Sequence, residues 1–155
     1  MKGYGVYEIV VGAKNLPELV RQSVQEAAEI RCPGEVVSIM RKEPFLMDRR
    51  DEERVYVIGV NSRKKVVGVS MISQGTHDAS LVSTREVFMR LLMMGAKGFL
   101  MVHNHPGGGS DPSGEDIKVT QMMKEAGRLM SINLLDHIIM AEDCYYSFKE
   151  RGMLV

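Results

Sequence analysis

The chain has 155 residues, of which 45% are hydrophobic and 26% charged, and 20 basic side chains balance 20 acidic ones. This length and composition fit one ordinary globular domain with a buried core. A formal net charge of zero argues against a strongly basic surface for nucleic acid or acidic membranes, although it leaves a local patch open. The two cysteines are far apart and no apolar run approaches the roughly 20 residues of a membrane span, so we expect a cytoplasmic protein.

Residues 1–32 predict a strand and helix extension ahead of the main domain. Residues 4–12 are typical of a short strand. A helix is expected from residue 15 or 16 through residue 31, because Pro17 is tolerated in a first helical turn and apolar residues recur at roughly helical spacing. A Pro-Gly pair then interrupts the chain, and residues 33–155 are expected to form the main domain as one compact unit.

The rest of the chain alternates between helical and extended patterns. β-branched runs predict a hairpin of two strands, and amphipathic stretches bounded by cap residues predict helices. Strands that alternate with helices, together with one hairpin, predict an α/β fold with a mixed sheet and helices packed on it. The expected elements are helical turns over 35–41, a polar connection over 42–53, strands over 55–60 and 66–72, a helix over 84–94 that Gly95 ends, a strand over 98–102, a Gly/Pro/Ser loop over 106–113, a helix over 114–130, and strands over 132–140 and 145–148.

The candidate metal-binding and catalytic side chains are concentrated in residues 99–117, FLMVHNHPGGGSDPSGEDI. His103 and His105 end an apolar run, and residues two apart in extended backbone project to the same side, so two imidazoles can face one point. Neutral imidazole suits Zn²⁺, which takes four tetrahedral ligands, and a catalytic zinc site keeps one position for water. A third protein ligand is then needed. Asp116 is the candidate, because the glycine-rich loop lets the chain fold back toward the strand end.

A structural role is the alternative for the same residues. Ser113 and Asp116 also match the pattern of a capping box at the start of a helix, and taken alone that interpretation is favoured. A lone His-x-His is likewise a weak signal. The combination of two histidines before a flexible loop with a carboxylate and a hydroxyl after it is much stronger, since it supplies what a two-histidine, one-aspartate zinc site requires.

The other two histidines stand singly. His77 lies in a polar loop, where we expect it to be solvated. His137 follows Asp136 in an apolar run, where the pair is expected to break the strand predicted over 132–140. A hydrogen-bonded structural role is favoured for His137 over a role as a metal ligand.

The motif resembles that of a known superfamily. His-x-His-Pro at residues 103–106, six further residues and then Ser113-x-x-Asp116 match the pattern of the JAMM (MPN+) metalloproteases. The stretches HNHPGGG, DPSGEDI, STREVFMRLLMMGAKGFLMVHNHP and LLDHIIM are similar to the RadC-like branch of that superfamily, over roughly residues 33–150. The resemblance implies a JAB/MPN-like fold, with layers of sheet and helix similar to those of cytidine deaminases. Residues 107–111, GGGSD, depart from the Ser-Gly-Asp-Pro more usual in RadC-like proteins, but loop length is preserved.

The resemblance also implies a mechanism. In the superfamily two histidines and an aspartate bind zinc, which carries over to His103, His105 and Asp116. The reaction would be hydrolysis of an amide or isopeptide bond in a peptide or protein substrate. Ser113 would donate its hydroxyl to the oxyanion of the tetrahedral intermediate, and one such donor is typically worth about 10²–10³ in rate.

A glutamate upstream of the hairpin completes the superfamily's site as general base and then acid. The stretch DEERVYVIGV occupies that place, and Glu53 aligns best with it. Its neighbour Glu52 differs by one register, and alternation along a strand allows only one of the two to face the metal. Glu86, in TREVFMR, is a second contender, with a surface position or an ion pair to Arg85 or Arg90 as its structural alternative.

Two other functions compete with a zinc peptidase. A role in DNA repair or nucleic-acid processing is the one after which the RadC family is named, but neutral charge and few aromatic residues give it thin support. A binding module that keeps the fold without turnover is the other, and such members of the superfamily usually lack the ligands found here. A zinc deaminase is disfavoured, because its H-x-E and P-C-x-x-C signature is missing. We expect no membrane partner, and the substrate and the oligomeric state stay open.

Overall fold

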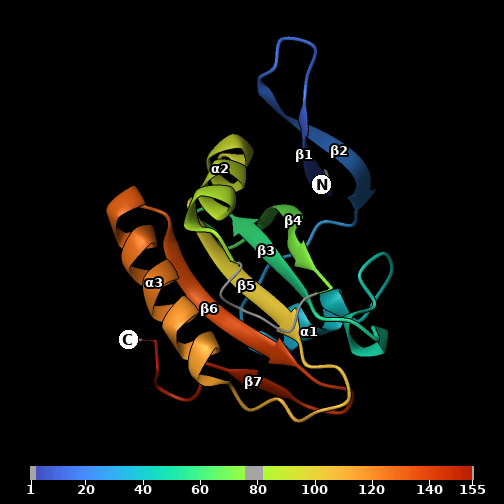
Figure 1. The fold of residues 1–155 in the computed structure, drawn as a ribbon, viewed down its shortest axis with the longest axis vertical. Helices are drawn as coiled ribbons and strands as arrows, with labels where there is room; N and C mark the ends of the chain where they lie inside the picture. Colours follow the sequence, from blue (N-terminus) through green and yellow to red (C-terminus); the bar gives the residue numbers. More distant parts are fainter. Residues whose placement is uncertain (1–2, 76–81, 155) are drawn as a thin grey trace.

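The computed structural model describes residues 3–75 and 82–154, and its ribbon is drawn in Figure 1. In chain order the elements are β1 (Tyr4–Val11), β2 (Pro17–Gln25), α1 (Pro33–Met40), the 3-10 helix η1 (Met47–Arg49), β3 (Arg54–Val60), β4 (Val66–Gln74), α2 (Thr84–Met94), β5 (Gly98–Asn104), α3 (Gly114–Met130), β6 (Asn133–Met140) and β7 (Tyr145–Ser147). Within the described residues, seven strands form one mixed sheet flanked by three α-helices, which confirms the predicted α/β fold. His77 lies outside the described residues.

The strands of the sheet lie in the order β2-β1-β4-β3-β5-β6-β7. The predicted hairpin is confirmed, because β3 and β4 pair antiparallel. On its other side β3 pairs antiparallel with β5, and β5 pairs parallel with β6. The chain crosses from β5 to β6 through α3, which lies along β6 in Figure 1.

Each face of the sheet has its own apolar core, because side chains alternate along β3 and β5. Helices α2 and α3 cover one face, and α1 with the segment around η1 covers the other. The first core includes Val55, Val57, Phe88, Leu91, Phe99, Met101, Val119 and Met123; the second includes Val36, Met40, Phe45, Met47, Tyr56, Ile58, Leu100, Val102 and Ile138. The connection predicted to be polar over 42–53 therefore buries apolar side chains of its own.

The helix predicted over residues 15–31 is wrong. The chain instead turns between β1 and β2, where the N–H of Gly12 donates to the carbonyl of Leu16 at 2.9 Å, and β2 pairs antiparallel with β1. In Figure 1 this hairpin stands at one end of the sheet, and β1 joins the sheet by parallel pairing with β4. Hydrogen bonds to β1 override a helical spacing that was only approximate, and Val20 and Val24 favour strands.

The break predicted in the strand over 132–140 is also wrong, since β6 runs through Asp136 and His137. Both side chains are buried and find partners. The Asp136 carboxylate accepts hydrogen bonds from the His137 N–H at 2.8 Å, the Ser147 hydroxyl at 2.5 Å and the Lys149 N–H at 3.0 Å. A buried polar group that is fully paired does not have to interrupt a strand.

Among the described residues, no helix combines the length and the apolar character that a membrane crossing requires.

The seam between α3 and β6 depends on a glycine. A Cβ added at Gly127 would lie 2.6 Å from the backbone oxygen of Ile132. We expect Gly127→Ala to lower the free energy of unfolding by about 1–3 kcal/mol through overpacking, although alanine is the better helix former. Urea denaturation measures this change in the free energy of unfolding. The control is Gly34→Ala in α1, where the added Cβ would meet only the Cys32 sulfur at 3.8 Å, and stability should hold or rise. Equal stability of wild type and Gly127→Ala would contradict this packing.

Candidate metal centre

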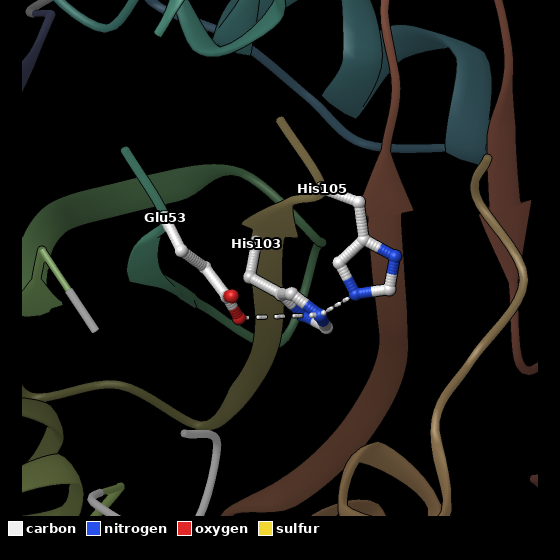
Figure 2. Close-up of side chains that lie close together, drawn as sticks. All are labelled: Glu53, His103 and His105. Carbon is white, nitrogen blue, oxygen red and sulfur yellow. Dashed lines mark hydrogen bonds and ion pairs between the residues drawn. The ribbon is translucent and has the colours of Figure 1, made fainter. Parts of the chain in front are cut away.

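The two motif histidines converge at the end of β5. His103 is the next-to-last residue of the strand, is 2% exposed, and pairs with Val55 across the ladder to β3. His105 follows the strand, and its N–H donates to the carbonyl of Met140 at 2.8 Å, which continues the alignment with β6. The Nε2 atoms of His103 and His105 lie 3.0 Å apart, and Figure 2 draws this contact as a dashed line between the two rings.

Asp116 faces both histidines from the first turn of α3. Its Oδ1 lies 3.2 Å from His103 Nε2, and its Oδ2 lies 3.3 Å from His105 Nε2. The capping box predicted as the alternative is also present: Ser113 Oγ accepts from the Asp116 N–H at 3.1 Å, and Asp116 Oδ2 accepts from the Ser113 N–H at 2.7 Å. One carboxylate therefore starts the helix and faces the two imidazoles at once.

Glu53 comes to the same point from the residue before β3. Its Oε1 lies 4.0 Å from His103 Nε2, and ligand atoms of Glu53, His103 and His105 all fall within 4.8 Å of one another (Figure 2). Glu52 faces elsewhere, since it pairs with Arg54 at 3.2 Å and accepts a hydrogen bond from Gln74. Of the two neighbouring glutamates, the structure brings Glu53 to the histidines.

Glu86 is engaged on α2. Its carboxylate pairs with Arg90 at 2.9 Å and with Arg85 at 3.3 Å. These are the ion pairs that the sequence offered as its structural alternative. Glu86 is not a member of the group of potential metal ligands found among the described residues.

The donor atoms fit a tetrahedral cation. Two donors bound about 2.1 Å from one tetrahedral zinc ion lie roughly 3.4 Å apart. The separations between His103 Nε2, His105 Nε2 and the Asp116 oxygens are 3.0, 3.2 and 3.3 Å. Nδ1 of His105 lies 3.1 Å from the carbonyl oxygen of Gly109, which can only accept, so Nδ1 carries the proton and Nε2 keeps its lone pair. Glu53 is an alternative third donor on distance alone.

The side chains of the site shift the pKa values of Asp116 and His105. Burial acts to raise the pKa of Asp116, but the neighbouring His103 and His105 side chains and the Ser113 N–H outweigh it and hold that pKa well below its usual range. The Asp116 carboxylate beside it raises the pKa of His105 above its ordinary value, because it favours the protonated ring. Burial lowers the pKa of His137, behind His103, well below its ordinary value. Asp116 is therefore an anion at neutral pH, as a ligand for a cation must be.

Asn104, between the two histidines, holds the backbone on both sides of Glu53. Its Oδ1 accepts from the N–H of Arg54 at 2.8 Å, and its Nδ2 donates to the carbonyl of Glu52 at 3.0 Å. The Glu53 carbonyl in turn accepts from the N–H of Gly75 at 2.8 Å. These bonds fix the main chain of Glu53 beside the histidines.

A pocket of about 370 Å³ opens over the site. It gives a reacting molecule access to the glutamate, to one histidine and to the start of α3. Its lining residues are Glu53, His105, Pro106, Gly108, Gly109, Ser113 and Asp116.

All five residues predicted for the site thus lie together, although their roles stay predictions. The sequence did not single out Asn104 or Thr120. The hydroxyl oxygen of Thr120 lies 2.6 Å from Nδ1 of His137, and His137 is hydrogen-bonded as expected. A signal for Thr120 was present, because it lies four residues after Asp116 and so shares a helix face with it.

Comparison with known proteins identifies relatives. A family model described as the RadC-like JAB domain matches residues 30–153. Proteins named UPF0758 are similar: one from Alkaliphilus metalliredigens is 38% identical over 81% of this chain and 53% of its own length. Others from Desulfitobacterium hafniense and Chlorobium chlorochromatii are 35% and 32% identical over 88% and 94% of this chain, and 61% and 64% of theirs. The chain thus spans little more than half the length of these relatives.

The two hydrogen bonds by which the Asn104 side chain holds the backbone on either side of Glu53 can be tested by a substitution that changes one atom. Asn104→Asp keeps the acceptor for the Arg54 N–H but sets a carboxylate oxygen against the Glu52 carbonyl. We expect the free energy of unfolding at neutral pH to fall by about 1–3 kcal/mol, the cost of a buried group left without its partner. The same change at exposed Asn133 is the control and should have little effect. If urea denaturation showed equal losses in the free energy of unfolding at the two positions, the structural role of the Asn104 hydrogen bonds would be refuted.

Proposed function

Because the chain belongs to the RadC-like JAB-domain family, we propose that it is a zinc-dependent hydrolase of amide or isopeptide bonds. The observation that carries the proposal is the convergence of His103 Nε2, His105 Nε2 and the Asp116 carboxylate, with Glu53 beside them. The spacing of these donors supports a tetrahedral ion, and the pocket over them supports access for a substrate.

His103, His105 and Asp116 would hold the zinc. Two neutral imidazoles and one carboxylate are a donor set that zinc favours, and three protein ligands leave a fourth position open. Bound zinc supplies a Lewis acid, which polarises a carbonyl and lowers the pKa of water to about 7. Asp116 is assigned as the third ligand ahead of Glu53, because its oxygens are 3.2 and 3.3 Å from the histidine nitrogens, whereas Glu53 is 4.0 Å from His103.

Glu53 would move the proton. Its carboxylate lies beside the histidines but farther from them than Asp116, which leaves room for a water that it can orient and deprotonate. The same carboxyl then returns the proton to the leaving amine. The buried setting of Glu53 and the Asn104 bonds on either side of it keep this group in place.

Ser113 would stabilise the oxyanion of the substrate. In the capping box its Oγ acts as an acceptor for the Asp116 N–H, so its own hydroxyl proton is left for another partner. Ser113 also lines the pocket, where that proton can be donated to a substrate oxygen. The capping role and the catalytic role therefore use different parts of one hydroxyl group.

The substrate in this proposal is a peptide or protein. Hydrolysis of an ordinary peptide bond and of an isopeptide bond would use the same residues, so both linkages are candidates.

The zinc assignment is tested by metal content. We expect about one zinc per chain in the wild type and in Glu53→Gln, and loss of zinc in His103→Ala and Asp116→Ala, because only the last two remove proposed ligands. Elemental analysis of folded protein dialysed against limiting zinc measures it. Retained zinc in Asp116→Ala together with lost zinc in Glu53→Gln would exchange the roles of the two carboxylates.

The hydrolase assignment needs a separate readout. Fluorogenic peptides and lysine-ε-linked isopeptides form the substrate panel, and Glu53→Gln should lose about 10²–10⁴ in rate as a general base does. Glu52→Gln is the matched control, since Glu52 pairs with Arg54 rather than facing the histidines, and it should retain activity. A wild type that binds zinc but cleaves neither linkage would favour a binding module over an enzyme.

A further inference from the structure

Behind the metal centre, His103 rests on a second histidine. Its Nδ1 lies 2.8 Å from Nε2 of His137, while its Nε2 faces Asp116 and His105. An imidazole with one proton can offer a lone pair from only one nitrogen. His103 can therefore serve as a ligand through Nε2 only if Nδ1 carries the proton and donates it to His137.

The direction of the hydrogen bond between His103 and His137 is set by Thr120, on the other side of the His137 ring. Nδ1 of His137 lies 2.6 Å from the hydroxyl oxygen of Thr120, and that oxygen lies 2.6 Å from the backbone carbonyl oxygen of Asp116. A carbonyl only accepts, and two oxygen lone pairs cannot share so short a contact, so the Thr120 hydroxyl donates to Asp116. Thr120 has one proton, and toward His137 it can then only accept.

The remaining assignments follow in order. His137 must donate from Nδ1 to Thr120, which leaves a lone pair on its Nε2. That lone pair accepts the Nδ1 proton of His103, and the lone pair of His103 falls on Nε2. The His137 ring cannot easily turn away, since it is 1% exposed and stacks on Phe148 with ring centres 4.9 Å apart and planes 6° apart.

We infer that Thr120 and His137 are positioning residues that fix the tautomer of His103, so that its Nε2 is presented to the metal. The inference rests on the proposed zinc site. The direction of this chain of hydrogen bonds is set by the backbone carbonyl of Asp116, whose side chain is itself a proposed ligand. One turn of α3 therefore orients both a carboxylate ligand and a histidine ligand. Removal of a group that orients a ligand histidine typically weakens metal binding about 10–100-fold.

The test compares two substitutions at one position. Thr120→Val keeps the branched shape but removes the hydroxyl, whereas Thr120→Ser keeps the hydroxyl. We expect the zinc dissociation constant, measured by chelator competition, to rise about 10–100-fold in Thr120→Val and to stay within about threefold of wild type in Thr120→Ser. Equal affinity in wild type and Thr120→Val, or equal weakening in both variants, would overturn the inference.

A second readout does not depend on metal binding. Ring ¹⁵N chemical shifts in the zinc-free wild type report which nitrogen of each histidine is protonated. We expect protons on Nδ1 of both His103 and His137, and loss of this preference at His103 in Thr120→Val. A proton on Nε2 of His103 in the wild type would overturn the inference. Failure of the wild type to bind zinc, with the Nδ1 proton in place, would instead count against the proposed function.

Discussion

The pairing of β3 with β5 is the constraint on which the site depends. Val55 lies opposite His103 in this antiparallel ladder, and that register carries Glu53 to the end of the strand where the histidines stand. Because side chains alternate along a strand, a slip of one residue would turn His103 to the opposite face of the sheet. Asn104 closes the ladder by bonding the backbone on both sides of Glu53. The distance between the proposed base and the proposed ligands is thus set by main-chain hydrogen bonds.

The start of α3 supplies the complementary charge. Asp116 lies in the first helical turn, where the helix dipole and the free N–H groups favour an anion, and it accepts the Ser113 N–H at 2.7 Å. Burial of a carboxylate is costly unless it is paired, and the two histidines provide that pairing. The choice between a helix cap and a ligand, which the sequence presents as alternatives, therefore does not arise, because the geometry allows both.

The parts of the site that could be predicted are those whose spacing is local. His103, His105, Ser113 and Asp116 lie on one strand end, one loop and one helix start, so their sequence separation limits their distance in space. Glu53 needed the family resemblance, because strand alternation says only that one of Glu52 and Glu53 can face the histidines, and the structure brings Glu53 there. The spacing of Thr120 from Asp116 puts the two on one helix face, but the contact of Thr120 with His137 and the hydrogen bonds of Asn104 to the backbone beside Glu53 join distant segments, which spacing does not reveal. The misassigned helix over 15–31 has the same origin, since pairing with β1 decides its structure.

The positions of the buried polar side chains show which of them are better explained by function than by the stability of the fold. Among the described residues, the buried polar or charged side chains are Glu53, Ser70, His103, Asn104, Asp116, Thr120, Asp136, His137 and Ser147. All but Ser70 belong to one connected region formed by the residue before β3, β5, the start of α3, β6 and β7. Such groups contribute little net stability even when paired, and apolar residues would pack a sheet as well. Six of them, Glu53, His103, Asn104, Asp116, Thr120 and His137, lie near the end of β5 that carries the histidines, and this clustering is better explained by the chemistry of the candidate metal centre than by the stability of the fold.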